Sequence, residues 1–211
     1  MTNPLRRPFS YSYCHFTLLL AAVNILVFIL TKMRPYMLTY LALNPVNFIN
    51  HKMWWQLVTC MFTHGGTSHL FWNMFGLLMF GPYVERAIGS KEFSLMYFLC
   101  GIINSLFSLG FYLVTGQYNV FLIGASGVIY TILFAFTVIF PSIRIFIFWV
   151  IPVPGPVMII IYTIIAIGSQ LLSFNMNIAH MTHLFGFVTA WFYFVIRMGV
   201  NPIKVWKNAR H

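Results

Sequence analysis

Long apolar runs, separated by short polar or proline-containing stretches, dominate this chain of 211 residues. A helix that crosses a membrane needs about 20 mainly apolar residues, and several runs approach or reach that length. We predict six spans, at about residues 16–30, 69–84, 93–114, 126–140, 157–172 and 178–196. The pattern therefore predicts an all-α polytopic membrane protein, built as a bundle of six helices.

The segments between the predicted spans differ in character. Residues 32–68 are rich in aromatic residues and include Met53-Trp54-Trp55-Gln56, so we expect a long first loop that lies in the membrane interface, with tryptophans as anchors. The prolines at 152, 154 and 156 predict a loop before the fifth span. Residues 1–15 and 198–211 would be short tails, and residues 1–211 would form a single domain.

Composition supports the membrane assignment, since 60% of the residues are hydrophobic and only 7% are charged. The formal net charge of +10 comes from scattered residues and does not indicate nucleic-acid binding. With six spans, both termini share one side, which would carry nine basic residues: Arg6, Arg7, Arg86, Lys91, Arg144, Arg197, Lys204, Lys207 and Arg210. The other side would carry only Lys32, Arg34 and Lys52, so the positive-inside rule predicts cytoplasmic termini.

The scarcity of acids excludes several kinds of enzyme. The chain has no aspartate, and its only acids are Glu85 and Glu92, which excludes an intramembrane aspartyl dyad and a Ser-His-Asp triad. It also lacks His-Glu-x-x-His, the zinc motif of many metalloproteases. The cysteines at 14, 60 and 100 are widely spaced and are interpreted as small hydrophobic residues rather than as a disulfide framework.

The stretch from Gly124 to Tyr130 delivers Ser126 to the start of the fourth apolar run. Free backbone N–H groups and the positive end of the helix dipole favour negative charge there, which suits a nucleophile whose attack creates an oxyanion. The alternative is a small-residue face, including Gly127, that packs against another helix.

Two further spans place polar groups at a similar depth. His69 and Asn73 share one face of the second span, and His183, Gly186 and Ala190 form a stripe on the sixth. At about 1.5 Å of rise per residue, the polar groups lie roughly 18 to 24 Å above the cytoplasmic ends of their helices. A serine and a histidine meeting in one layer predict acyl transfer, with His183 as the base and with His69, Asn73 and the Ser126 N–H holding the oxyanion.

These motifs together resemble the rhomboid intramembrane serine proteases of the six-span form, over about residues 10 to 200. Gly124-x-Ser126-Gly127 resembles the nucleophile motif, and His69-x-x-x-Asn73 the oxyanion-side motif. His183-x-x-Gly186-x-x-x-Ala190 and Glu85-x-x-x-Gly89 resemble two further signatures. The resemblance implies a serine endopeptidase with a Ser126–His183 dyad, Gly124 on the oxyanion side, and Tyr130 packed on the ring of the base.

The resemblance also implies substrates, a location and the absence of a cofactor. Substrates would be single-span or multi-span membrane proteins, cut near the extracytoplasmic end of a transmembrane helix, within the lipid bilayer and without nucleic acid. A bacterial inner membrane is expected. Residues 173–177 would form part of a gate over the site.

Some residues leave alternatives open. His64 either lines a water entry with Gly65 and Gly66 or is a plain loop histidine, and His180 is expected to pack beside the base. The family's first loop often carries Trp-Arg, whereas this chain has Trp55-Gln56, a change that we expect to remove a hydrogen-bond donor. Ala190 adds one methyl group where the family has glycine.

Two rival functions remain. A metal-binding protein would use His64, His69, His180 and His183 with Cys60 nearby, because imidazoles are good zinc or copper ligands. A catalytically inactive rhomboid-like binder of membrane proteins would usually have lost the serine or the histidine, and both are present.

Overall fold

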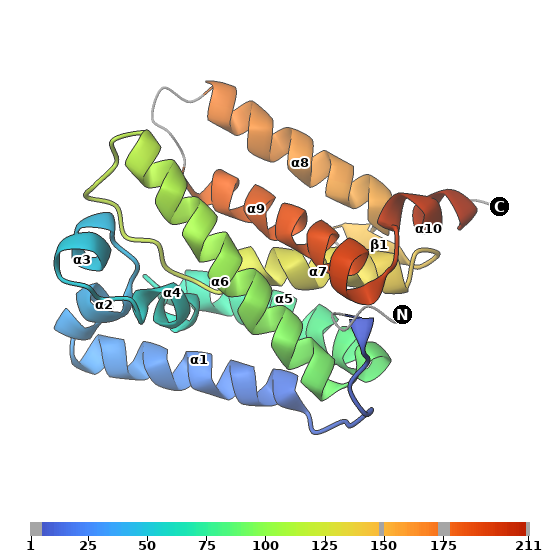
Figure 1. Cartoon of the computed structure of the whole chain (residues 1–211), viewed down its shortest axis with the longest axis horizontal. Coiled ribbons are helices and arrows are strands. Elements are labelled where there is room, and N and C mark those ends of the chain that lie inside the picture. The colour runs from blue at the N-terminus through green and yellow to red at the C-terminus, as the bar shows by residue number, and fades with distance from the viewer. Residues whose placement is uncertain (1–5, 148–149, 173–177, 210–211) are drawn as a thin grey trace.

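A computed structural model describes residues 6–147, 150–172 and 178–209 (Figure 1). Only the backbone is described for residues 147 and 162 and for residues 165–172 and 178–180. Six long helices are present in these ranges: α1 (Phe16–Met33), α5 (Thr67–Ile88), α6 (Ser90–Val114), α7 (Ser126–Ile139), α8 (Gly155–Leu172) and α9 (Ile178–Phe192). A π-helical segment, η3 (Tyr193–Met198), continues α9, and a short helix, α10 (Pro202–Asn208), follows it.

Each long helix overlaps one predicted span. The fourth agrees within a residue, while α5 begins two residues before the predicted start and continues through Ile88. Three stretches of the described chain are both long and apolar enough to cross a membrane, namely Phe16–Met33, Ser90–Val114 and Met181–Met198. The number of spans stays a prediction.

Short helices form the first loop. They are α2 (Tyr36–Leu41), α3 (Pro45–Asn50), α4 (Gln56–Thr59) and η2 (Cys60–Phe62), and they gather at the end of the bundle opposite both chain termini (Figure 1). Gln56 is fully buried, and its Nε2 donates to the carbonyl oxygens of Thr39 at 3.3 Å and Tyr40 at 3.2 Å. The expectation of a lost donor at this position was wrong, because the shorter amide still reaches the loop backbone.

The proline-marked loop is also different from the prediction. Two short strands, β1 (Arg144–Ile147) and β2 (Ile151–Pro154), pair as a small antiparallel hairpin, in which Arg144 pairs with Pro154 and Ile147 with Ile151. Proline is tolerated in an edge strand, where a backbone N–H is not required. The hairpin therefore accommodates two prolines that the sequence interpretation assigned to irregular structure.

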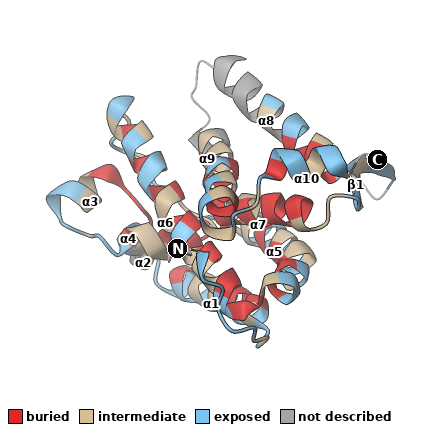
Figure 2. Ribbon diagram, turned by 45° about the vertical axis from the view of Figure 1, so that its right-hand side comes forward, coloured by how far each residue is buried: buried red, intermediate tan, exposed pale blue. Residues whose placement is uncertain are grey.

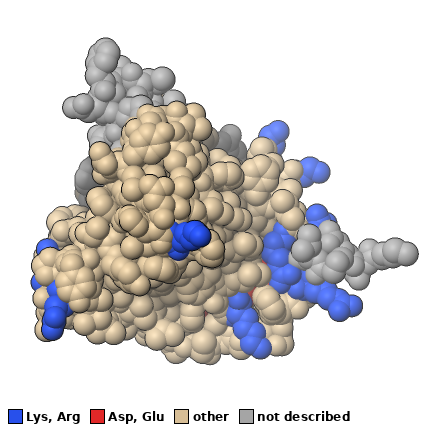
Figure 3. Space-filling view, turned by 60° about the vertical axis from the view of Figure 1, so that its left-hand side comes forward, with Lys and Arg blue, Asp and Glu red and all other residues tan. Residues whose placement is uncertain are grey.

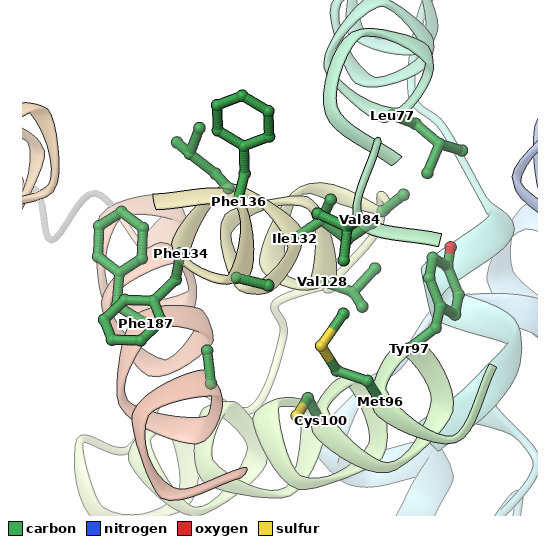
Figure 4. Close-up of a cluster of buried hydrophobic side chains, with 14 of the residues drawn as sticks. Leu77, Val84, Met96, Tyr97, Cys100, Val128, Ile132, Phe134, Phe136 and Phe187 are labelled. Atoms are coloured by element: carbon green, nitrogen blue, oxygen red, sulfur yellow. The ribbon is translucent and has the colours of Figure 1, made fainter. Parts of the chain in front are cut away.

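Helix α7 is the centre of the bundle and is buried along most of its length (Figure 2). It packs most extensively on α9 and also contacts α5 and α6. Figure 4 shows how Val128 and Ile132 of α7 meet Leu77 of α5 and Met96 of α6. An uncharged helix of bulky apolar residues can occupy this position because no polar side chain on it must reach solvent.

The two acids hold helix ends together instead of taking part in the predicted site. The carboxylate of Glu85 accepts hydrogen bonds from the backbone N–H groups of Phe16 and Thr17, at 2.6 and 2.8 Å, and from the Ser90 hydroxyl. It thereby caps the first turn of α1. Glu92 forms a 2.8 Å ion pair with Arg197, which ties α6 to η3.

Candidate active site

A pocket of about 760 Å³ opens between α5, α7 and α9. Its lining combines the polar residues singled out in the sequence with a mainly apolar wall: His69, Trp72, Asn73, Tyr112, Val120, Phe121, Leu122, Ile123, Ser126, Ile129, Tyr130, Thr182 and His183. The structure therefore brings Ser126, His183, His69 and Asn73 to one cavity, from three different helices. A largely apolar cavity with a few convergent polar groups is typical of a small-molecule or peptide site.

Ser126 is the first residue of α7 and follows a tight turn. Gly124 has a φ of +109°, a backbone conformation that residues other than glycine rarely adopt. Its N–H donates to the Cys60 carbonyl oxygen at 2.9 Å. The hydrogen bond fixes the turn against the first loop. Because the first N–H groups of a helix have no partner within it, the backbone beside Ser126 can stabilise a negative oxygen in the pocket.

A close approach of α7 and α9 places Ser126 near His183. A Cβ atom added at Gly186 would overlap the carbonyl oxygen of Gly127, so a larger residue cannot fit without separating the helices. Gly127 directly follows Ser126, and Gly186 lies one turn after His183. The Thr131 hydroxyl also donates to the Gly186 carbonyl oxygen at 3.0 Å, which links the same two helices one turn deeper.

The ring of His183 stacks on Tyr130. The ring centroids are 4.2 Å apart and the planes are inclined by only 8°. Tyr130 lies one turn after Ser126 on α7. The same helix therefore carries the serine hydroxyl and the aromatic ring on which the imidazole stacks. Such a ring contact restricts the imidazole to a small range of orientations.

His69 and Asn73 form the opposite wall. The Asn73 side-chain amide donates to the His69 carbonyl oxygen at 2.7 Å, which leaves its second N–H for another acceptor. His69 lies against the Gly124 turn, where a Cβ atom would come within 2.6 Å of its Nε2. His69 therefore adjoins the backbone that leads into Ser126, and Asn73 lines the same pocket, on the side from which an oxyanion could receive hydrogen bonds.

His64 lies behind this wall and is almost completely buried, with 1% of its surface exposed. Neither ring nitrogen has a hydrogen-bond partner among the described residues, and its ring meets that of His69 edge to face at 5.1 Å. Burial, with a smaller contribution from His69, lowers the pKa of His64 to about 4, so its ring is neutral near pH 7. A small cavity on its other side is lined by Thr31 and Lys32.

The remaining predicted residues do not line this pocket or lie partly outside the described residues. The backbone of His180 lies in the first turn of α9, but its side chain lies outside the described residues, as do residues 173–177, the expected gate. Ala190 is fully buried in the core. Among the described side chains, no group of three His, Cys, Asp or Glu residues could hold a metal ion.

Sequence reasoning did not identify several residues of the site. Trp72, Tyr112, Phe121 and Thr182 line the pocket, and the hydroxyls of Ser108 and Thr182 lie 3.1 Å apart behind it. The polar residues of the third span were an available signal, because polar groups inside a membrane helix usually face the interior of the bundle. The aromatic residues carried no such signal, since the chain is rich in them throughout.

The fold and this pocket define a helical membrane protein with a serine and a histidine converging from two packed helices. Comparison with known proteins places it more closely, because a family model described as a Rhomboid domain matches residues 51–199. The chain therefore belongs to the rhomboid family, and the prediction of an integral, polytopic helical membrane protein is confirmed.

The relatives of this chain include proteins named as proteases and a protein named as inactive. The chain is 34% identical to YdcA of Bacillus subtilis (strain 168) over 135 residues, which are 63% of this chain and 62% of YdcA. It is 34% identical to the rhomboid protease GluP of the same organism, over 46% of this chain and 20% of GluP. It is also 39% identical to the inactive RHOMBOID-like protein 8 of Arabidopsis thaliana, over 29% of this chain and 17% of that protein. The chain spans less than two thirds of the length of each.

Proposed function

We propose that this protein is an intramembrane serine endopeptidase that cleaves transmembrane helices of other membrane proteins. The observation that carries the proposal is the shared pocket of Ser126 and His183, with the ring of His183 stacked on Tyr130 at 4.2 Å. Membership of the rhomboid family and the similarity to a relative named a protease support the same function.

In the proposed reaction, the Ser126 hydroxyl attacks a substrate carbonyl carbon while His183 takes the hydroxyl proton. The new oxyanion receives hydrogen bonds from the Ser126 N–H, from Asn73 and from His69. The imidazolium of His183 then gives its proton to the leaving amine, which breaks the peptide bond. Because the chain contains no aspartate and both of its glutamates are held at helix ends away from the pocket, Tyr130 rather than a carboxylate orients the base.

Hydrolysis of the acyl-enzyme requires a water molecule within the membrane protein. His183 would deprotonate that water as it did the serine hydroxyl, and the second attack would regenerate Ser126. We place the water entry at the end of the bundle that carries the first loop. The nearly buried, unpaired ring of His64 supports this placement, since a buried polar group without a protein partner favours bound water.

We also propose a topology. Both chain termini lie at the end of the bundle opposite the first loop (Figure 1), and the positive-inside rule puts that end in the cytoplasm. The pocket then opens toward the extracytoplasmic half of the bilayer. A substrate helix must unwind there before its carbonyl groups become available, because helical carbonyls are already hydrogen-bonded. We propose a bacterial inner membrane as the location.

The direct test is cleavage of a model single-span substrate in liposomes by the wild type, Ser126→Ala and His183→Ala. Ser142 and His51 are exposed residues outside the pocket, so Ser142→Ala and His51→Ala are matched controls. We expect the first two variants to lose at least about a thousandfold in kcat, as removal of a nucleophile or its base does in other serine enzymes. The controls should cut like the wild type.

A second readout separates an inactive enzyme from an unsuitable substrate. A fluorophosphonate probe reacts with an activated serine without needing a substrate helix, and we expect it to label the wild type but not Ser126→Ala. If folded wild type is neither labelled nor active, the protease proposal is wrong and a binding function takes its place. Cleavage by folded Ser126→Ala at the wild-type rate would exclude the serine as nucleophile.

A further inference from the structure

A second groove, of about 630 Å³, lies at the opposite end of the bundle from the candidate active site. It runs between the last turns of α5 and the hairpin, and it shares no residue with the first pocket. Its lining is almost entirely apolar or aromatic, with one charged residue: Leu78, Met79, Phe80, Tyr83, Phe136, Ile143, Arg144, Ile145 and Phe146. The volume is within the range of about 300–1,000 Å³ that is typical of ligand sites.

The walls of this groove are open to the surroundings. Leu78 and Tyr83 are 42% and 57% exposed, and on the other wall Ile143, just before β1, and Phe146 of β1 are 46% and 54% exposed. In an integral membrane protein, a surface of this kind lies against lipid rather than water. Its occupant should therefore carry hydrocarbon.

Arg144 gives the groove a charged rim. Its side chain is exposed and has no hydrogen bond or ion pair with the described residues. The only two acids of the chain are buried and already engaged: the carboxylate of Glu85, a residue of α5, caps the start of α1, and Glu92 pairs with Arg197. Figure 3 shows accordingly that the charges visible on one face are almost all Lys and Arg. The guanidinium therefore lacks an internal counter-ion, and a planar guanidinium suits a phosphate oxygen pair.

We infer that this groove binds one anionic glycerophospholipid, with its acyl chains against α5 and the hairpin and its phosphate at Arg144. Hydrocarbon and a negative headgroup together match an apolar cleft with a single cation at its edge. Anionic lipids are also concentrated in the cytoplasmic leaflet, the side on which the basic residues place this end of the bundle. The inference does not depend on protease activity.

Lipid binding by the purified protein tests this inference. The protein is prepared in a neutral detergent and titrated with phosphatidylglycerol or with phosphatidylcholine, and bound lipid is counted by native mass spectrometry. The variants are Arg144→Gln, which removes the cation; Leu78→Trp, which fills the groove from an exposed position; and Lys204→Gln, which removes an exposed cation that does not line the groove. Unfolding temperature without added lipid checks that each variant is folded.

We expect the wild type to bind phosphatidylglycerol more tightly than phosphatidylcholine. Arg144→Gln should weaken phosphatidylglycerol binding about fivefold and abolish the preference, since one basic residue near a bilayer surface has an effect of that size. Leu78→Trp should weaken both lipids, and Lys204→Gln neither. The inference fails if the wild type does not discriminate between the lipids, or if Lys204→Gln acts as strongly as Arg144→Gln. It also fails if Leu78→Trp leaves lipid binding intact and instead slows substrate cleavage, because the groove would then hold a substrate helix.

Discussion

The His183 ring lies parallel to the Tyr130 ring, with centroids 4.2 Å apart. Tyr130 follows Ser126 by one helical turn, whereas His183 lies on α9, 53 residues after Tyr130. The stacking therefore couples the orientation of the proposed base to the helix that carries the proposed nucleophile.

Removing the Tyr130 ring should slow catalysis without weakening substrate binding. An aromatic pair contributes about 0.5–1.5 kcal/mol beyond the area that it buries, so Tyr130→Ala is expected to lower kcat roughly two- to tenfold with little change in KM. Tyr130→Phe keeps the ring and should retain most of kcat. Steady-state cleavage kinetics in liposomes provide the measurement, and a Phe variant as impaired as the Ala variant would contradict a role for stacking.

The contact of α7 with α9 at Gly186 should tolerate no side chain. Because a methyl group there would overlap the Gly127 carbonyl oxygen, Gly186→Ala is expected to destabilise the protein by about 1–3 kcal/mol and to lower kcat as His183 moves away from Ser126. Gly110→Ala is the matched control, since a Cβ atom at Gly110 of α6 meets no other atom within 4 Å. Thermal unfolding of both variants, with kinetics, tests this expectation. Equal stability of the two variants would show that the helices can separate at no cost.

Acidification should destabilise the protein through His64. The folded state keeps this ring neutral down to a pKa of about 4, while the unfolded chain binds a proton near pH 6.5. Stability is therefore unaffected by this group above pH 6.5 and is lost as the pH falls from there toward 4. Between pH 7 and pH 5 the contribution of His64 to this loss should be about 2 kcal/mol.

A variant without His64 provides the comparison for that experiment. His64→Gln should lose less stability over the same pH interval, because His69 and the other titrating groups remain in both proteins and cancel in the difference. His51→Gln, at an exposed position, should behave like the wild type. Identical pH slopes for wild type and His64→Gln would mean that His64 titrates normally.

Glu85 should matter for folding and not for chemistry. Its carboxylate accepts from two backbone N–H groups at the start of α1 and from the Thr17 and Ser90 hydroxyls. In Glu85→Gln, an amide NH₂ would face these donors, and we expect a loss of about 2–4 kcal/mol in unfolding free energy. The rate per folded molecule should stay near the wild-type value. Lys91→Gln, at an exposed neighbouring position, is the control, and unfolding curves with active-site titration are the measurements.

Much of the helical framework follows from local sequence. The run after Ser126 is uninterrupted until Pro141, which cannot extend a helix, so α7 begins and ends within one residue of its predicted bounds. The hairpin of β1 and β2 was missed because its prolines favour irregular structure locally, and only pairing between the two short strands makes it regular. Gln56 was misjudged for a related reason: its hydrogen-bond partners, Thr39 and Tyr40, are on a different part of the folded loop.

The sequence by itself determined the candidate serine and the candidate histidines and predicted a common depth for them in the membrane, because helical rise and apolar run length are local properties. Tertiary structure decided which of these groups meet. The overlap at Gly127 and Gly186 sets the separation of α7 and α9, the Tyr130 ring sets the orientation of His183, and burial leaves His64 without a partner. Such relationships depend on packing between segments far apart in the chain, which no local pattern records.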